Sequence, residues 1–299
     1  MPTIELEHIN KTFGPLKAVD DVSFQVEAGE IFGLLGPNGA GKTTTIRIML
    51  DIFKPDSGRV SILGGEMDAA KKNRIGYLPE ERGLYQDTPV DRCLVYLATL
   101  KGLSKNEAVK KIDEYLLRFD LAEHKHKKVK ELSKGMQQKA QLIATLVHSP
   151  DMIIIDEPFS ALDPVNTQMV KDLLREERTK GKTIVMCTHQ MHQVEELCDR
   201  LVLINQGHVV LYGQLEQIRR QFAGRELEVR VSSPLPERLP GISDCAAVNG
   251  GFRLKLEPGS SPQEILRELV LQNVMIEQFE IAMPTLDEIF IQVVKSTND

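Results

Sequence analysis

Short, largely apolar runs dominate the hydrophobic pattern of this sequence. Residues 31–35, 152–155 and 183–188 form such runs, and runs of this length are typical of buried parallel strands. Between the runs, apolar positions recur at helical spacing. One such helix is predicted to begin at Ser133, with apolar positions at Ala140, Ile143, Ala144 and Val147. Strands that alternate with helices predict an α/β fold with a mostly parallel sheet.

Two regions depart from this alternation of strands and helices. Around residues 4–6 and 22–26, apolar residues alternate with polar ones, which predicts two half-buried strands before the first buried run. The same alternation returns near the C-terminus, at residues 227–231 and 252–256. A capping box at residues 261–264 then predicts a helix, so this part of the chain combines strands and helix.

The change of pattern divides the chain. We predict a first domain at residues 1–222 and a small α+β domain at residues 223–299. Within the first domain, the stretch from about residue 88 to residue 147 is predicted to be mostly helical. A length of 299 residues suits two domains.

Composition limits what the protein does. A net charge of −6 gives no support for nucleic-acid binding as the main activity. The four cysteines contain no C-x-x-C pair, which argues against zinc sites and disulfides and favours a reducing cytoplasm. We see no signal peptide at the N-terminus and no apolar run near the roughly 18 residues that a membrane span needs. A function at the membrane therefore requires a partner.

A glycine-rich segment follows the first buried run and carries the clearest chemistry. The sequence GPNGAGKT at residues 36–43 fits the pattern G-x-x-x-x-G-K-[ST] of a phosphate-binding loop. Its glycines allow backbone N–H groups to surround a polyphosphate at a helix N-terminus. Lys42 is predicted to reach the β- and γ-phosphates, and the Thr43 hydroxyl to ligate Mg²⁺. The full predicted phosphate-binding set is Gly36, Pro37, Asn38, Gly39, Ala40, Gly41, Lys42, Thr43 and Thr44.

Four further features, in a fixed order, resemble the motifs of ABC-type ATPases. They are LSKGMQQ at 132–138, IIIDEP at 153–158, SALDP at 160–164, and the single residue His189. The first is similar to the family signature, with Lys134 and Met136 at positions that usually hold Gly and Gln. The resemblance covers roughly residues 3–220.

The resemblance implies a fold and a chemistry. It implies an ABC ATPase domain with a parallel core sheet, an antiparallel N-terminal sheet and a helical subdomain at about residues 88–147. Asp156, after a buried strand, is suited to hold the Mg²⁺ shell, and Glu157 to activate the attacking water. By its place in the family pattern, His189 is expected to contact the γ-phosphate of ATP, and Phe13 to stack on the adenine.

The resemblance also implies a site shared by two subunits. In this family the signature region, here Ser133, Lys134, Gly135 and Met136, covers ATP bound to the opposing subunit. Asp163 lies in the family's aspartate loop between the two sites. We therefore expect a dimer that encloses two ATP–Mg²⁺, and complete half-sites permit a homodimer.

One position departs from the family pattern. The loop after residues 75–79 usually carries a Gln that contacts Mg²⁺ and couples to the membrane subunit, and here that position is Glu80. A carboxylate can ligate Mg²⁺, so Glu80 is counted with Thr43 and Asp156 as a metal ligand. Its added negative charge near the phosphates is expected to slow hydrolysis or alter coupling.

The C-terminal domain closes with PTLDEIF at residues 284–290. With this segment it resembles the tail of ATP-binding subunits of ABC-2-type exporters, including sodium-export and drug-efflux systems. The chain is therefore expected to be an exporter ATPase that works with a membrane permease subunit, at the cytoplasmic face of the cell membrane. Two alternatives stay open: a soluble ABC-type ATPase acting on DNA or ribosomes, and a nucleotide-dependent regulatory protein with little turnover.

Overall fold

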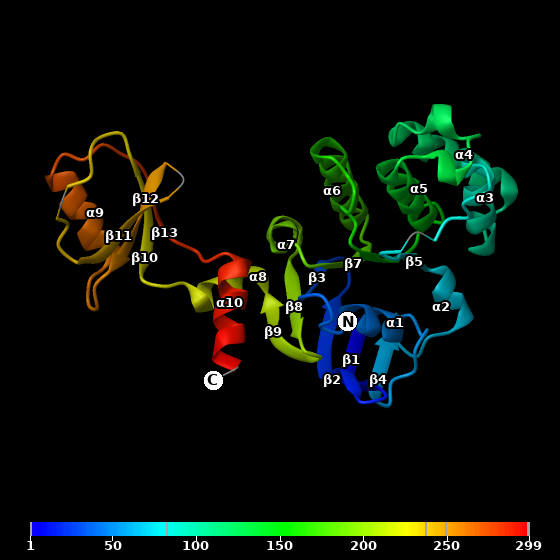
Figure 1. The fold of residues 1–299 in the computed structure, drawn as a ribbon, viewed down its shortest axis with the longest axis horizontal. Coiled ribbons are helices and arrows are strands. Elements are labelled where there is room, and N and C mark those ends of the chain that lie inside the picture. Colours follow the sequence, from blue (N-terminus) through cyan, green and yellow to red (C-terminus); the bar gives the residue numbers. More distant parts are fainter. Residues whose placement is uncertain (1, 82, 237, 249, 298–299) are drawn as a thin grey trace. The chain divides into compact units, whose positions relative to one another are not determined.

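The computed structural model describes residues 2–297 apart from residues 82, 237 and 249. The chain divides into two compact units, Met1–Leu215 and Glu216–Asp299 (Figure 1). No helix of the described residues has the length and hydropathy to cross a membrane.

Unit 1 contains two sheets. The smaller one is antiparallel and has the strand order β2 (Leu16–Glu27), β1 (Pro2–Phe13), β4 (Ser57–Ile62). The larger one has the order β5 (Ile75–Leu78), β6 (Met152–Asp156), β7 (Thr183–Thr188), β3 (Ile31–Leu35), β8 (Arg200–Asn205), β9 (His208–Gln214). Neighbouring strands from β5 to β8 pair in parallel, and only β9 runs antiparallel to its neighbour β8 among the described residues. Every residue of β3, β6 and β7 is buried, which confirms the prediction drawn from the three apolar runs.

Helices and short turns connect these strands. The helices of unit 1 are α1 (Lys42–Met49), α2 (Ala69–Asn73), α3 (Val90–Leu100), α4 (Lys105–Arg118), α5 (Lys134–Leu146), α6 (Pro164–Thr179) and α7 (Met191–Leu197). Two 3₁₀ turns, Ala122–His124 and Val129–Glu131, lie between α4 and α5. Helices α3, α4 and α5 pack against one another beyond the end of the large sheet (Figure 1). They form the mostly helical stretch that the sequence predicts.

Unit 2 is a four-stranded antiparallel sheet with three helices. Its elements are α8 (Leu215–Phe222), β10 (Glu226–Val231), β11 (Ile242–Val248), β12 (Gly251–Leu256), α9 (Pro262–Leu271), β13 (Ile276–Ile281) and α10 (Leu286–Thr297). The strand order is β11-β12-β10-β13. Alternate residues of β10 and β12 pack against Ile265 and Leu269 of α9 to form its core.

The two units separate before residue 222, where we predicted the domain boundary. Most of α8 belongs to the second unit, because the Arg219 guanidinium donates hydrogen bonds to the carbonyls of Met283 and Pro284. The predicted capping box at Ser261 and Glu264 is present and begins α9.

The strand order places the predicted motifs at one edge of the large sheet. Strand β7 pairs with β6 on one side and with β3 on the other, all in parallel. The carboxyl ends of these strands therefore lie next to one another. The glycine-rich loop follows β3, Asp156 ends β6, and Thr188 ends β7.

Candidate functional site

The glycine-rich loop is shaped by close backbone contacts. Gly36 and Gly41 have φ angles of 149° and 105°, which side chains other than hydrogen rarely allow. A Cβ at Gly36 would lie 2.1 Å from the carbonyl oxygen of Ile204, and one at Gly41 would lie 2.3 Å from that of Ala18. Only glycine fits at these two positions, so the loop conformation depends on them.

Lys42 is the first residue of α1 and its side chain returns to the loop. Its Nζ donates hydrogen bonds to the carbonyl oxygens of Gly36, at 2.8 Å, and Pro37, at 3.1 Å. The residue is buried, with 8% of its surface exposed. An ammonium group in this position can exchange carbonyl oxygens for the oxygens of a polyphosphate with little movement of the backbone.

Most of the predicted site residues surround one cavity of about 400 Å³. The cavity joins the end of β1 and the start of β2 to the glycine-rich loop, the Glu80 loop and the end of β6. It is lined by Phe13, Leu16, Ala18, Asn38, Gly39, Ala40, Gly41, Lys42, Thr43, Thr44, Glu80, Asp156 and Glu157. Residues from four separate segments of the sequence, at 13–18, 38–44, 80 and 156–157, therefore meet here.

Asp156 is a buried carboxylate without a full set of partners. It is only 2% exposed, and its Oδ2 atom accepts no hydrogen bond in the described part of the chain. Burial raises the pKa of Asp156 above its usual value, and a hydrogen bond with Cys187 offsets this only in part. A divalent cation at this oxygen would supply the missing partner. Thr43 and Glu80 line the same cavity and offer further oxygen ligands, so this donor set fits Mg²⁺.

Glu157 and His189 are in direct contact. Oε1 of Glu157 accepts hydrogen bonds from the backbone N–H of His189, at 2.9 Å, and is 2.6 Å from its Nδ1. Oε2 of Glu157 accepts the Thr188 hydroxyl at 3.1 Å. The backbone of Glu157 has a φ of 49°, which turns the chain sharply after Asp156. The carboxylate is thus oriented by residues at the end of β7.

Phe13 lies at the end of β1 and is 42% exposed. Its ring lies edge-on to Phe53 at 5.5 Å between centroids, and the Lys11 ammonium is 5.5 Å from its centroid. One part of the ring is therefore fixed by packing, while the residue also lines the cavity beside the glycine-rich loop.

The signature residues are not among those that line this cavity. Ser133 caps the N-terminus of α5, where its Oγ accepts the N–H of Met136 at 3.2 Å, and Lys134 after it is exposed. A Cβ at Gly135 would lie 3.0 Å from the carbonyl of Ala161, so the signature and the aspartate loop are neighbours.

Asp163 caps the next helix, α6. Its Oδ1 accepts the backbone N–H of Asn166 at 2.9 Å, and hydrogen bonds from Asn166 lower the pKa of the Asp163 carboxyl. Like the signature residues, Asp163 does not line the cavity around the glycine-rich loop.

Sequence reasoning missed several residues that support the site. Thr188 orients Glu157, and Gln138 of α5 donates to the carbonyls of Glu157 and Pro158 at 3.4 and 3.3 Å. Gln141, on the same helix, donates to the backbone on both sides of Glu80. The only signal in the sequence was a set of glutamines beside the signature.

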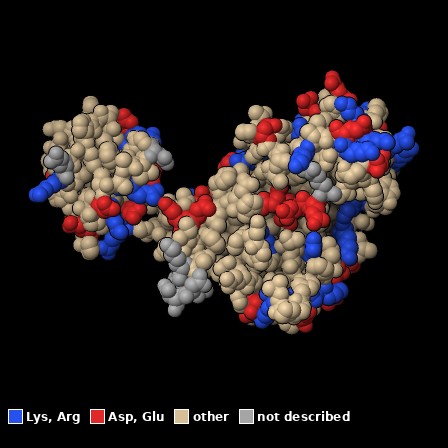
Figure 2. Space-filling model, viewed as in Figure 1, with Lys and Arg blue, Asp and Glu red and all other residues tan. Residues whose placement is uncertain are grey.

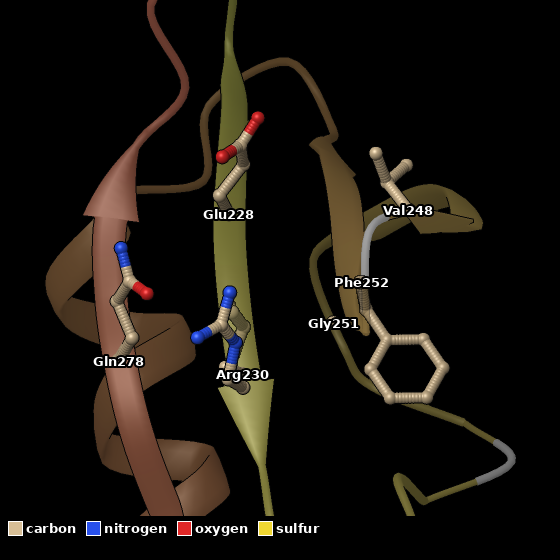
Figure 3. A pocket seen from close by; sticks show the side chains of 7 residues that line it. Glu228, Arg230, Val248, Gly251, Phe252 and Gln278 are labelled. Carbon is tan, nitrogen blue, oxygen red and sulfur yellow. The ribbon is translucent and has the colours of Figure 1, made fainter. Parts of the chain in front are cut away.

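One hollow on the sheet of unit 2 is much smaller than the cavity around the glycine-rich loop, with a volume of about 70 Å³ (Figure 3). Glu228 and Arg230 of β10, Gln278 of β13 and Phe252 of β12 lie around it. A volume of this size accommodates a few water molecules at most. We assign no chemistry to it.

On the face seen in Figure 2, acidic and basic side chains of the described residues are interspersed on both units.

Two families of known domains match the chain. Residues 19–160 match the family described as "ABC transporter". Residues 213–294 match the family described as "ATP-binding protein DrrA1-3-like, C-terminal domain". The first match lies within unit 1, and the second lies within unit 2 except for residues 213–215.

Several relatives match nearly the full length. The uncharacterized ABC transporter ATP-binding protein YhaQ of Bacillus subtilis (strain 168) is 40% identical over 97% of this chain and 98% of its own. The linearmycin resistance ATP-binding protein LnrL of the same organism is 30% identical, over 98% and 99% of the two chains. The daunorubicin resistance ATP-binding protein DrrA3 of Streptomyces coeruleorubidus is 31% identical, over 97% and 95%.

A solved structure described as an ATP binding subunit of an ABC transporter superposes with a TM-score of 0.69 at 32% identity. The superposition covers 74% of this chain and 93% of the chain in the solved structure. The fold class predicted from the sequence is confirmed, and so is the resemblance to exporter ATPases. The protein therefore belongs to the ATP-binding proteins of ABC transporters, and it is an ATPase of the type that includes drug-resistance proteins.

Proposed function

We propose that this protein is the ATP-hydrolysing subunit of an exporter, which closes as a dimer around two ATP–Mg²⁺ and drives a separate membrane subunit. The observation that carries the proposal is the division of the site. The cavity collects the phosphate loop, Asp156 and Glu157, while the signature at Ser133 lies outside it. A second copy of the chain would bring its own signature to the open side of this cavity.

Each residue has a role in this proposal. Lys42 and the backbone N–H groups of the loop bind the phosphates, and Phe13 stacks on the adenine. Thr43, Asp156 and Glu80 hold Mg²⁺, which when bound neutralises charge on the phosphates. Glu157 orients the attacking water and accepts its proton, and His189 contacts the γ-phosphate.

In the proposed dimer, the N-terminus of α5 faces the γ-phosphate of the opposing subunit. A helix of 13 residues carries partial positive charge at this end, which favours an anion. Lys134 adds a full positive charge beside it. Phosphoryl transfer needs such charge on the γ-phosphate, and among the described residues that line the cavity Lys42 is the one cation.

The membrane subunit is proposed to dock beside the Glu80 loop. A groove of about 440 Å³ lies between this loop, α3 and α5, and its apolar lining includes Leu84, Leu97 and Leu100. An apolar segment of the membrane subunit suits this surface, and it would hold the ATPase at the inner face of the cell membrane. The export direction rests on unit 2, because that unit resembles the C-terminal domain of resistance ATP-binding proteins.

Purification from detergent-solubilised membranes tests the proposal. We expect a membrane-spanning protein to co-purify with the tagged chain and to alter its ATPase rate. The variant Leu100→Glu, with a charge in the groove, should lose the partner while keeping ATPase activity. Leu117→Glu is the matched control, because Leu117 is exposed but lies outside the groove. A chain that hydrolyses ATP and never associates with membranes would contradict the proposal and favour a soluble ATPase.

A further inference from the structure

Three glutamines of α5 make the same unusual contact. Each is buried, and each donates its side-chain N–H₂ group to two backbone carbonyls of a neighbouring loop. Gln137 donates to Val129 and Leu132, before the signature. Gln138 donates to Glu157 and Pro158, after β6. Helix α5 therefore fixes the backbone of two different loops, one before the signature and one after β6.

The third glutamine, Gln141, holds the loop that carries Glu80. Its Nε2 donates to the carbonyl of Pro79 at 3.2 Å and to that of Glu81 at 3.2 Å. These two carbonyls lie immediately before and after Glu80. Gln141 is only 4% exposed, and its Oε1 accepts no hydrogen bond among the described residues. The orientation of the amide is thus set by the loop carbonyls alone.

We propose that Gln141 is the positioning residue that places Glu80 in the nucleotide site, and that it thereby sets how strongly nucleotide binding depends on a divalent cation. The inference rests on the proposed role of Glu80 at the metal. Gln141 does not line the cavity. It acts by fixing the backbone on both sides of Glu80, the one described residue of this loop that does line the cavity.

The dependence on the cation follows from charge. Glu80 and Asp156 bring two carboxylates into a cavity that also receives a triphosphate. Like charges a few ångströms apart repel, and repulsion within a partly buried site is screened less than in water. A divalent cation relieves this repulsion. The affinity ratio, defined as nucleotide affinity with Mg²⁺ divided by affinity in EDTA, therefore reports on the position of the Glu80 carboxylate.

A double-mutant cycle tests the inference on the full chain. Binding of a fluorescent ATP analogue is measured with Mg²⁺ and with EDTA for the wild type, Glu80→Gln, Gln141→Met and the double variant. We expect Glu80→Gln to lower the affinity ratio about tenfold, and Gln141→Met to lower it about threefold to tenfold. The double variant should match Glu80→Gln alone, because the position of residue 80 matters only while it carries a charge.

Two matched controls accompany the cycle. Gln137→Met removes an equivalent pair of hydrogen bonds, from the same helix to a different loop. The affinity ratio should therefore not change. Glu81→Gln removes a charge from the same loop at a residue that does not line the cavity, and the ratio should again stay constant. Gln141→Asn, whose shorter amide fails to reach both carbonyls, replaces Gln141→Met if the latter folds poorly.

The outcomes separate the inference from the proposed function. If Glu80→Gln lowers the ratio but Gln141→Met does not, or if their effects are additive, the positioning role of Gln141 is overturned and the role of Glu80 stands. If Glu80→Gln leaves the ratio unchanged, both the metal role of Glu80 and the cation linkage through Gln141 are overturned. Amide hydrogen exchange at Leu78, Glu80 and Glu81 gives an independent check, because Gln141→Met should accelerate it; unchanged exchange would also overturn the inference.

Discussion

The Glu157 carboxylate is oriented by Thr188 and His189, as its proposed role as a general base requires. Replacing Glu157 by Gln keeps the shape but removes the proposed proton acceptor. We expect the rate of ATP hydrolysis to fall by about 10²–10⁴-fold, since general-base catalysis contributes a factor of this size. ATP binding should persist, because Lys42 and the loop remain in place. Phosphate release and nucleotide titration measure the two effects, and an unchanged rate would exclude Glu157 as the base.

At the scale of single residues, the sequence predicted candidate residues for the chemistry but missed the residues that support them. Lys42, Asp156 and Glu157 belong to motifs whose spacing carries a mechanism. Gln138 and Gln141 carry no such pattern, because a glutamine in an amphipathic helix looks the same whether it faces solvent or a backbone carbonyl. Their burial depends on which loops pack against α5, and only tertiary structure determines that.

Helix α5 also ends beside a half-buried histidine. His148 follows the helix, with its Nε2 3.2 Å from the carbonyl of Ile75, and burial lowers the pKa of His148 to about 4. In the unfolded chain the pKa of His148 is near 6.5. Between pH 4 and pH 6.5 this side chain therefore binds a proton in the unfolded chain but stays neutral in the folded chain. Stability therefore falls as the pH drops from about 6.5 to about 4, by about 3 kcal/mol from this group.

The variant His148→Gln should remove that part of the acid sensitivity. Glutamine keeps a donor for the Ile75 carbonyl but does not titrate. Urea unfolding at pH 7 and pH 4.5 should show a loss of stability smaller by about 2–3 kcal/mol than in the wild type. His126→Gln is the control, because the His126 side chain is 76% exposed. If both variants lose stability with pH as the wild type does, the half-buried histidine is not the cause.

Elements were predicted where one physical pattern dominated. The fully buried strands β3, β6 and β7 appeared as apolar runs, and α9 as a capping box. Strands β11 and β13 escaped prediction because most of their residues are exposed at the edges of the unit 2 sheet. The short helices α2 and α7 span too few residues for their spacing to stand out.

At the scale of the whole molecule, the two units have separate hydrophobic cores. Separate cores predict separate thermal transitions in calorimetry. ATP–Mg²⁺ at 100 times its dissociation constant should stabilise only the transition of unit 1, by about 2.7 kcal/mol. The control is Lys42→Ala, in which neither transition should move. A common shift of both transitions would show that the two units unfold as one.

The proposed site, shared by two subunits, leads to a prediction that compares two substitutions in the same chain. Lys42→Ala removes the ammonium that reaches the phosphates, so it should weaken ATP binding itself. Ser133→Arg adds bulk at the exposed N-terminus of α5, outside the cavity, so ATP binding to the monomer should persist. In the proposed dimer Ser133 faces the nucleotide of the opposing subunit, and there the arginine should obstruct closure.

Size-exclusion chromatography and nucleotide titration separate these effects. In a Glu157→Gln background, where ATP is bound but not consumed, the parent should dimerise with ATP–Mg²⁺. Adding Ser133→Arg should keep it monomeric with ATP affinity unchanged, whereas adding Lys42→Ala should lose both properties. If the two changes weaken ATP binding alike, the signature contacts nucleotide within one chain, and the proposed pairing of two half-sites fails.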